Sequence, residues 1–461
     1  MPSYEELQRR HVAEAMARLP EQVERLTWSS EQLAAHRSES LRQLVRTAQE
    51  RSPWHRRRLA GIDPDTLTEE GLAALPVMTK EDLMGNFDEI LTDPNLDLDL
   101  IEAHIEGLTD DAYLLDRYHA VASGGSSGRR GVFVYDWDGW TLVYLGLIRY
   151  ELWRQERDRA EHAGPMVTAA VAAGRASHAS KALFQSFSSP DRVIHPLPVT
   201  LPLDEIVEGL NRIQPHVLMS YPSALLSLAH EADVGRLRIS PRRISVGAEP
   251  LLPEIRRAAE EAWSVPVLNI YGASEAGGLG VSCGYGPGLH LVDDLLIVEA
   301  VDNAGQPVKP GNRSDKIFVT NLFNTTLPLI RYEITDEITL TGEACRCGSA
   351  HRLIEDPQGR LDDTFRYDDL DVHPLVFRSP LGLRRHIAEY QVHQTSRGAD
   401  IALCCTGPVD FAGLRAEIVA KLATVGLDDA EVIITTVDRL ARQDTGKLKR
   451  FIPLKPALAG R

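Results

Sequence analysis

Glycine, serine and arginine dominate the stretch VASGGSSGRRGVFVYD, which spans residues 121–136. Backbone amides in such a loop can converge on an anion, while serine hydroxyls and two neighbouring arginines add donors and charge. The stretch fits neither the Walker pattern G-x-x-x-x-G-K-[ST] nor the dinucleotide fingerprint G-x-G-x-x-G. On its own, a segment of this composition is more typical of a flexible surface loop than of a binding site.

Cysteine and histidine form a second candidate cluster. The segments CGYGPGLH and CRCG supply two short ligand pairs, Cys283 with His290 and Cys345 with Cys347. Such pairs fit a tetrahedral Zn²⁺ site with three cysteines and one histidine, which is structural because four protein ligands leave no open position. The alternative is a set of buried cysteines beside a loop histidine. The other two cysteines, Cys404 and Cys405, lie in a strand-like pattern that favours packing over metal binding.

The segments around these residues alternate between strand-like and helical patterns from 130 to 280. Strand-like VFVY, MVTAAVAA, HVLMSY, RISVGA and VPVLNIYG are separated by helical patterns near 138–159, at 203–213, from Pro222 and at 252–263. Repeated units of this length predict an α/β fold with a parallel or mixed sheet covered by helices. Ligands of such sheets bind at loops beyond the strand ends, which is where SGGSSG, SVGAEP and IYGASEAGG fall.

The chain is too long for one hydrophobic core, and its composition changes along its length. Residues 1–60 have helical spacing, and 285–345 read as short strands and turns that indicate a small β subdomain. After GRLDD, at 359–363, a shorter α+β pattern begins. We therefore predict a large N-terminal domain over 1–360 and a small mobile α+β domain over 361–461.

Charge and composition exclude several classes of protein. The 461 residues carry 50 basic and 66 acidic side chains, a net charge of −16, which argues against a nucleic-acid partner. Five cysteines without a secretion signal do not describe a disulfide framework. The longest apolar runs are too short to span a bilayer, and the chain starts with an amphipathic helical pattern. These features predict a cytoplasmic protein with no membrane partner.

Five further segments follow the glycine-rich loop in a fixed order. They are SVGAEP (245–250), IYGASEAGG (270–278), LPLIRYEITDEI (327–338), GRLDD (359–363) and RQDTGKLKR (442–450). Together with ASGGSSGRRG they resemble the ordered core motifs of the adenylate-forming superfamily, which includes acyl- and aryl-CoA synthetases. The segments LRQLVRTAQERSPWHRRRL, LAALPVMTKEDL, YPSALLSLA and GLHLVDD resemble its phenylacetate–CoA ligase-like branch. The resemblance covers roughly residues 40–455, and six motifs in order make it specific.

The resemblance implies that these motifs bind ATP. The loop from Ser123 would wrap the β- and γ-phosphates, small residues at SVGAEP would lie beside the adenine, and Asp336 would accept both ribose hydroxyls. The residues so assigned are Ser123, Gly125, Ser126, Ser127, Gly128, Arg129, Gly247, Ala248, Glu249, Pro250, Tyr271, Gly272, Ser274, Asp336, Arg360 and Lys447. Tyr271 offers a π-face to the adenine, and Ser274 a phosphate contact.

The resemblance also implies the chemistry. A carboxylic acid, with aromatic acids as the family-level expectation, attacks the α-phosphate, pyrophosphate leaves, and an acyl-adenylate forms and is passed to a thiol, by default CoA. Glu275 would hold Mg²⁺, a cation that prefers oxygen ligands. Arg360 would reach phosphate and Lys447 would neutralise charge that builds during the attack. Some relatives in this branch carry a metal at the position of the cysteine–histidine cluster, and a homodimer is an assembly that the analogy allows.

One departure from the family pattern leaves the acceptor open. Relatives that form CoA thioesters usually have glycine nine residues after the arginine of GRLDD, and this chain has Asp369 there. A carboxylate would narrow and acidify the path of the pantetheine arm. An amide-forming ligase or an adenylyltransferase with a non-CoA acceptor is therefore the alternative. A non-catalytic nucleotide-binding protein is disfavoured, because Glu275, Asp336, Arg360 and Lys447 are all present.

Overall fold

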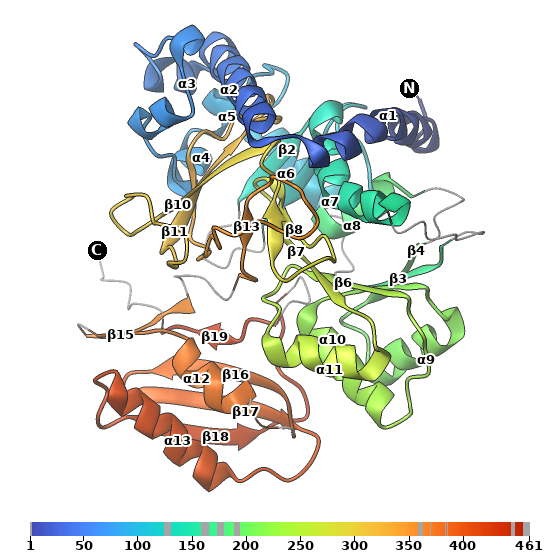
Figure 1. Cartoon of the computed structure of the whole chain (residues 1–461), viewed down its shortest axis with the longest axis vertical. Helices are drawn as coiled ribbons and strands as arrows, with labels where there is room; N and C mark the ends of the chain where they lie inside the picture. The colour runs from blue at the N-terminus through green and yellow to red at the C-terminus, as the bar shows by residue number, and fades with distance from the viewer. Residues whose placement is uncertain are drawn as a thin grey trace.

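Helices and strands of the computed structural model form a larger body and a smaller C-terminal body beside it, the latter coloured orange to red in Figure 1. The described residues are 2–123, 131–157, 166–172, 179–188, 194–357, 363–368, 370–382, 384, 386–443 and 448–454. Within them, no helix combines the length and the apolar character that a membrane crossing needs.

The first part of the chain is helical, as its apolar spacing predicts. The helices are α1 (Tyr4–Glu24), α2 (Ser30–Arg51), α3 (Pro53–Arg58), α4 (Lys80–Gly85), α5 (Phe87–Ile90) and α6 (Leu98–Gly107). Ser3 and Ser29 begin α1 and α2 with capping boxes, so the exposed amides of each first turn are satisfied locally. The helix α1 packs along α7 (Trp137–Arg157) and contacts α8 (Ala179–Ser186).

An eight-stranded mixed sheet forms the centre of the larger body. Its spatial order is β13 (Leu353–Ile354), β9 (Leu289–Leu291), β8 (Gly277–Val281), β7 (Val267–Ala273), β6 (Arg243–Gly247), β5 (Val217–Ser220), β3 (Thr168–Ala172) and β4 (Ile194–Pro198). The strands β3 to β7 run parallel, while β8, β9 and β13 are antiparallel to their neighbours. The carboxyl ends of β5, β6 and β7 therefore meet at one edge.

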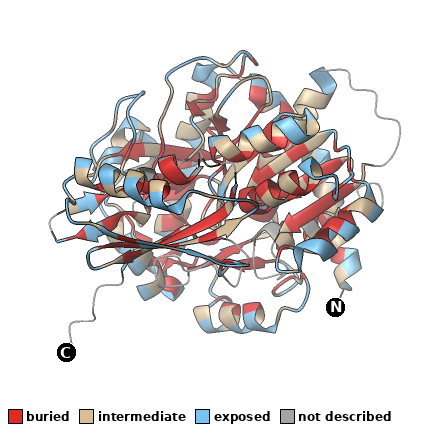
Figure 2. Ribbon diagram, turned by 90° about the horizontal axis from the view of Figure 1, so that it is seen from below, coloured by how far each residue is buried: buried red, intermediate tan, exposed pale blue. Residues whose placement is uncertain are grey.

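Helices cover this sheet on both faces. Apolar residues of β3, β5 and β6 pack against α9 (Leu203–Ile213), α10 (Pro222–Asp233) and α11 (Pro253–Trp263) on one face. The other face, which carries Arg243, Ser245 and Gly247, looks toward α7. In Figure 2 the strands are largely buried and the outer helix faces are exposed, as expected for a sheet between helical layers.

Two smaller sheets complete the larger body. The hairpin of β1 (His119–Ala122) and β2 (Val132–Tyr135) brackets the glycine-rich segment. An antiparallel sheet of β10 (Leu296–Val301), β11 (Lys316–Asn321) and β12 (Tyr332–Ile334) lies within the range predicted as a small β subdomain.

The C-terminal body has a hydrophobic core of its own. It contains β14 (Phe365–Tyr367), β15 (Leu370–Val372), α12 (Leu375–Gly382), β16 (Ile387–Thr395), β17 (Gly398–Cys405), α13 (Phe411–Thr424), β18 (Glu431–Thr436) and β19 (Phe451–Ile452). The predicted α/β fold class is confirmed. The predicted boundary at 360 lies among residues 358–362, outside the described residues, and stays a prediction.

Candidate active site

A cavity of about 670 Å³ opens at the carboxyl ends of the parallel strands. Residues from the two bodies line it together, including Lys80 and Ser123 from the larger body and Gln443 and Leu448 from the C-terminal body. Ten of the sequence-predicted residues also line it: Ser123, Gly247, Ala248, Glu249, Pro250, Tyr271, Gly272, Ser274, Glu275 and Asp336. This is the edge at which sheets of this type bind ligands.

The end of β6 places backbone rather than side chains at the cavity wall. A Cβ atom at Gly247 would lie 2.8 Å from the carbonyl oxygen of Ile270, so only glycine allows β6 and β7 to approach this closely. Ala248 follows with a φ of 67°, in the left-handed region that non-glycine residues rarely adopt. The two small residues leave room for a flat ring.

Tyr271 and Asp336 are joined by a hydrogen bond at the cavity wall. The hydroxyl of Tyr271, on β7, donates a hydrogen bond of 2.7 Å to Oδ2 of Asp336, two residues beyond β12. Asp336 is only 4% exposed, yet it lines the cavity. Its carboxylate is thus presented to a ligand in one fixed orientation.

Ser274 and Glu275 are held through their backbone carbonyl groups. Tyr135 donates a hydrogen bond of 2.6 Å to the carbonyl of Ser274, and Asn321 Nδ2 donates one of 3.2 Å to that of Glu275. Burial raises the pKa of Tyr135 well above its usual value, and the nearby negative charge of Glu275 adds to the rise. The phenol therefore stays a donor at any working pH, and the side chain of Glu275 lines the cavity.

Ser123 closes the base of the glycine-rich loop. Its amide donates to the carbonyl of Gly131 at 2.8 Å, and its hydroxyl accepts from the amide of Gly131 at 2.9 Å. Lys80, at the start of α4, donates to the same hydroxyl at 3.3 Å. Sequence reasoning missed this cation, because only the fold brings α4 beside the hairpin. Gly125, Ser126, Ser127, Gly128 and Arg129 lie outside the described residues.

The C-terminal body reaches the cavity through the segment before β19. The carboxylate of Glu249 accepts the amide of Leu448 at 2.8 Å and the amide of Ser223 at 2.9 Å, which joins this segment to β6 and α10. Arg442 donates to Ser223 Oγ at 3.1 Å and pairs with Glu389 on β16. Sequence reasoning assigned no role to Arg442, although it opens the predicted motif RQDTGKLKR.

Three further residues singled out in the sequence also fall outside the described residues: Arg360, Asp369 and Lys447. The described residues on either side of the last, Gln443 and Leu448, both line the cavity. Pro357 and Asp363, which flank the segment with Arg360, line it as well.

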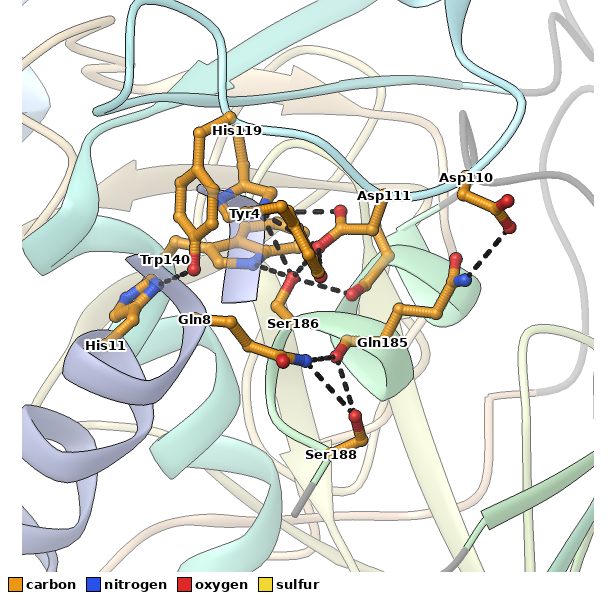
Figure 3. A network of polar contacts seen from close by, with 12 residues as sticks. Tyr4, Gln8, His11, Asp110, Asp111, His119, Trp140, Gln185, Ser186 and Ser188 are labelled. Carbon is orange, nitrogen blue, oxygen red and sulfur yellow. Dashed lines mark hydrogen bonds and ion pairs between the residues drawn. The ribbon is translucent and has the colours of Figure 1, made fainter. Parts of the chain in front are cut away.

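One wall of the cavity is held in place by a buried polar network, drawn in Figure 3. Asp111 accepts hydrogen bonds from Tyr4 at 2.6 Å and from Ser186 at 2.9 Å, and its carboxylate lies 3.3 Å from His119 Nε2. Trp140 Nε1 donates to Ser186 Oγ at 3.0 Å. The network joins α1, β1, α7 and the end of α8, whose neighbours Leu183 and Phe187 line the cavity.

The predicted cysteine–histidine cluster is assembled away from this cavity. The ligand atoms of Cys283, His290, Cys345 and Cys347 all lie within 4.8 Å of one another. The sulfurs of Cys283 and Cys345 are 3.6 Å apart, and Cys347 Sγ lies 3.3 Å from His290 Nε2. Because Zn–S bonds measure about 2.3 Å, tetrahedral ligands lie about 3.5–4 Å apart, and the spacing fits.

The surroundings of the cluster also suit a metal. His290 Nδ1 lies 3.0 Å from the carbonyl oxygen of His351, which fixes the proton on Nδ1 and leaves the lone pair of Nε2 facing the sulfurs. Backbone amides of Tyr285 and Ser349 donate to Cys283 Sγ at 3.5 Å and to Cys347 Sγ at 3.4 Å. Such donors stabilise thiolates over thiols.

No family model matches the chain. Among curated proteins, it is 27% identical over 394 residues to a phenylacetate–coenzyme A ligase of Thermus thermophilus, a match that covers 80% of each chain. Among solved structures, a 2-hydroxyisobutyryl-CoA ligase in its postadenylation state superposes with a TM-score of 0.73 at 19% identity, over 93% of this chain and 91% of that chain. The resemblance to the phenylacetate–CoA ligase-like branch of the adenylate-forming superfamily is confirmed.

The same 2-hydroxyisobutyryl-CoA ligase in its thioesterification state superposes less well. The TM-score is 0.59 at 19% identity, over the same 93% of this chain and 91% of that chain. This chain thus superposes better on the postadenylation structure of that ligase than on its thioesterification structure.

Proposed function

We propose that this chain, which resembles the phenylacetate–CoA ligase-like branch of the adenylate-forming superfamily, activates a carboxylic acid with ATP and transfers the acyl group to CoA. The carboxylate attacks the α-phosphate, pyrophosphate leaves, and the resulting acyl-adenylate is attacked by the thiol. The observation that carries the proposal is the cavity that Tyr271, Glu275 and Asp336 line together with Gln443 and Leu448 of the C-terminal body. A relative named phenylacetate–coenzyme A ligase, similar over 80% of the chain, supports this reaction.

The cavity residues have matching roles in binding ATP. The gap left by Gly247 and Ala248 takes the adenine, with the ring of Tyr271 against one face. Asp336, held by Tyr271, accepts the ribose hydroxyls. Ser123 and the loop that follows it donate to the β- and γ-phosphates, and Lys80 adds positive charge at the loop's base.

Lys447 is the proposed catalytic residue. Its ammonium would balance the charge that builds on the α-phosphate and carboxylate oxygens, and preorganised charge of this kind is often the largest catalytic contribution. It belongs to the C-terminal body, so a rotation of that body removes the lysine and admits the thiol. One site can then serve both half-reactions.

Glu275 is the proposed Mg²⁺ ligand. Its carboxylate lines the cavity beside Ser274, and the fixed backbone of both residues suits a hard cation that prefers oxygen donors. When bound, Mg²⁺ would neutralise phosphate charge; the chain's own contribution is to hold the carboxylate toward the phosphates.

Acid-dependent exchange of labelled pyrophosphate into ATP tests the first half-reaction. We expect exchange with the native chain and at least a hundredfold loss in Lys447→Ala, while Lys421→Ala, on α13, keeps the native rate. No exchange with any aryl, acyl or amino acid would refute the function. The second half-reaction is tested by product analysis with CoA or with amines. An acyl-CoA product supports the proposal, whereas an amide, or AMP left on the substrate, would establish the alternative acceptor that Asp369 suggests.

We also propose that Cys283, His290, Cys345 and Cys347 bind a structural Zn²⁺. Their geometry, the oriented imidazole and the amide donors to sulfur support this, and zinc would tie the β8–β9 loop to the segment before β13. Elemental analysis of the purified protein should give one zinc per chain. A metal content below a tenth of that after growth with added zinc would refute it.

A further inference from the structure

The helix α7 forms the wall of the cavity that faces the main sheet. Its cavity-lining residues recur at helical spacing along one stripe: Trp140, Val143, Tyr144, Leu147, Ile148, Glu151 and Gln155. Near the end of this stripe, Glu151 forms an ion pair with Arg243, whose row of the sheet lies at the end of β6 opposite Gly247. Because ATP is assigned to the part of the cavity around Gly247, Tyr271 and Asp336, the part along α7 is left to the acid.

The opposite stripe of the same helix packs against the cysteine–histidine cluster. The ring of Tyr150 stacks on the ring of His290, with centroids 5.3 Å apart and 20° between the planes. One turn from the end of the described helix, the side chain of Arg157 donates a hydrogen bond to the backbone carbonyl of Cys347. Two of the four proposed zinc ligands therefore contact α7 directly.

The loop that follows Cys283 contacts the helix as well. The amide of Tyr285 donates to Cys283 Sγ at 3.5 Å, and the ring of Tyr285 meets the ring of Trp153 edge-on, with centroids 6.0 Å apart. The guanidinium carbon of Arg157 lies 5.1 Å from the centroid of each of these two rings, an arrangement in which the cation and the rings attract. The last two turns of α7 thus rest on the cluster and its loop.

The strand β8 connects the cluster to the cavity side of the helix. A Cβ atom at Gly277 would lie 2.9 Å from Val143 Cγ1, and one at Gly278 would lie 2.7 Å from Leu147 Cδ2. The two glycines therefore let β8 pack closely against two side chains that line the cavity. Because β8 ends two residues before Cys283, the strand and the helix that packs on it are both anchored at the cluster.

We propose that the zinc-loaded cluster positions the last two turns of α7 and thereby sets the affinity for the acid, with Tyr150 and Arg157 as positioning residues. This inference rests on the proposed function and on the proposed zinc site. When bound, Zn²⁺ would fix the spacing of His290 and Cys347. The ring stack and the hydrogen bond then carry that constraint to the helix, as partners around a metal site orient its ligands in turn.

The middle of α7 has a separate anchor. Arg149 forms an ion pair with Asp294, and both side chains are fully buried. Loss of the metal should therefore leave the first part of the helix in place and loosen the part beyond this ion pair. That part carries Glu151 and Gln155, which line the cavity and are joined by a hydrogen bond of 2.6 Å.

Hydrogen–deuterium exchange of the whole chain, before and after zinc is removed with a chelator, tests the positioning without any substrate. We expect the amides of 150–157 to exchange about tenfold faster after removal, while those of 203–213, on α9, exchange as before. Arg157→Gln keeps all four proposed ligands, so it should retain zinc and still speed exchange in 150–157. The control Glu156→Gln alters an exposed residue on the same turn and should change neither. If the stripped chain unfolds as a whole, Arg157→Gln carries the test.

Steady-state rates give the functional measurement, with whichever aryl, acyl or amino acid supports the fastest pyrophosphate exchange. Tyr150→Leu and Arg157→Gln should raise the KM for that acid about fivefold or more. The KM for ATP and kcat should stay within about twofold, whereas a purely structural defect would lower kcat through loss of active protein and leave both KM values unchanged.

The outcomes separate this inference from the proposals on which it rests. If no acid supports exchange, the proposed function fails, and the deuterium measurement alone decides whether the cluster positions α7. If the purified chain holds no zinc after growth with added zinc, the inference falls together with the zinc site. Equal exchange in 150–157 with and without zinc, or an unchanged KM for the acid in both variants, would overturn the inference alone.

Discussion

The hydroxyl of Tyr271 lies 2.7 Å from the carboxylate of Asp336, and this hydrogen bond ties the end of β7 to the segment after β12. The two residues are 65 positions apart, with Tyr271 on a strand of the main sheet and Asp336 two residues beyond the last strand of the β10–β12 sheet. Because the bond fixes one oxygen of Asp336, the orientation of the carboxylate toward a nucleotide depends on the tyrosine as well as on the backbone.

Tyr271→Phe should therefore weaken ATP binding without removing the carboxylate. A hydrogen bond to a charged group contributes about 1.5–3 kcal/mol, so we expect the KM for ATP to rise about tenfold or more with a smaller change in kcat. Asp336→Ala should have a larger effect. The control is Tyr118→Phe, which removes a similar bond to Asp93 outside the cavity. Pyrophosphate exchange at varied ATP checks this, and an unchanged KM in Tyr271→Phe would contradict it.

Arg442→Ala should affect the two half-reactions unequally. Arg442 joins the C-terminal body to Ser223 of the larger body, so its removal should destabilise the arrangement to which the proposed function assigns adenylate formation. We expect adenylate formation to slow about tenfold, from the loss of about 1.5 kcal/mol, while thioester formation from supplied acyl-adenylate is retained. Arg384→Ala is the matched control, since its partner Glu417 lies in the same body. Equal slowing of both half-reactions by Arg442→Ala would contradict the arrangement.

Cys345→Ser should remove zinc and lower stability. A structural metal binds the folded state alone, so its loss lowers the unfolding free energy by several kcal/mol and the melting temperature by several degrees. Cys404→Ser, in β17, should keep both the zinc content and the melting temperature. Zinc release measured with a chromogenic chelator during thermal unfolding checks this, and full zinc content in Cys345→Ser would show that the cluster is not the site.

Local sequence patterns predicted the regular parts of the fold. The helical pattern at 203–213 is α9, and strand-like VFVY at 132–135 is β2. The strand β4 was missed because it contains Pro196 and Pro198, which are tolerated there because β4 is an edge strand. The strand β8 was missed because three of its five residues are glycine, which lack strand propensity.

The site was predicted in part, and for different reasons. Tyr271 and Asp336 were predicted as site residues from the ordered motifs. Their contact could not be predicted, because no local sequence pattern indicates a contact between residues 65 positions apart. The pair of Glu151 and Arg243 had no signal at all, since it exists only because α7 crosses the sheet at that row. The metal cluster was indicated by two short pairs of ligand residues, Cys345 with Cys347 and Cys283 with His290. The structure brings the two pairs together.

Asp111→Asn should loosen the wall of the cavity that α8 forms. Burial alone would raise the pKa of Asp111, but hydrogen bonding and charge from His119, with hydrogen bonds from Tyr4 and Ser186, lower it, so the carboxylate is charged. Loss of that charge should destabilise the fold by about 1–3 kcal/mol and raise the KM for the acid. Asp110→Asn alters an exposed neighbour and should do neither. Urea unfolding measures the stability, and rates at varied concentrations of the carboxylic acid substrate measure its KM. A KM equal to that of the native chain in Asp111→Asn would show that the network does not affect binding of the acid.

Two buried histidines should make the fold sensitive to mild acid. Burial lowers the pKa of His11 and of His55 to about 3, and the neighbouring His119 contributes at His11. In the unfolded chain the pKa of histidine is about 6.5. Each buried histidine therefore contributes its full share to the free energy of unfolding above pH 6.5, and this share is lost at about 1.4 kcal/mol per pH unit as the pH falls toward 3. The free energy of unfolding should therefore fall steeply between pH 6.5 and 5. In urea titrations, His11→Gln and His55→Gln should each flatten this slope, although both lower stability at pH 7. A slope equal to that of the native chain in both variants would show that other groups control acid stability.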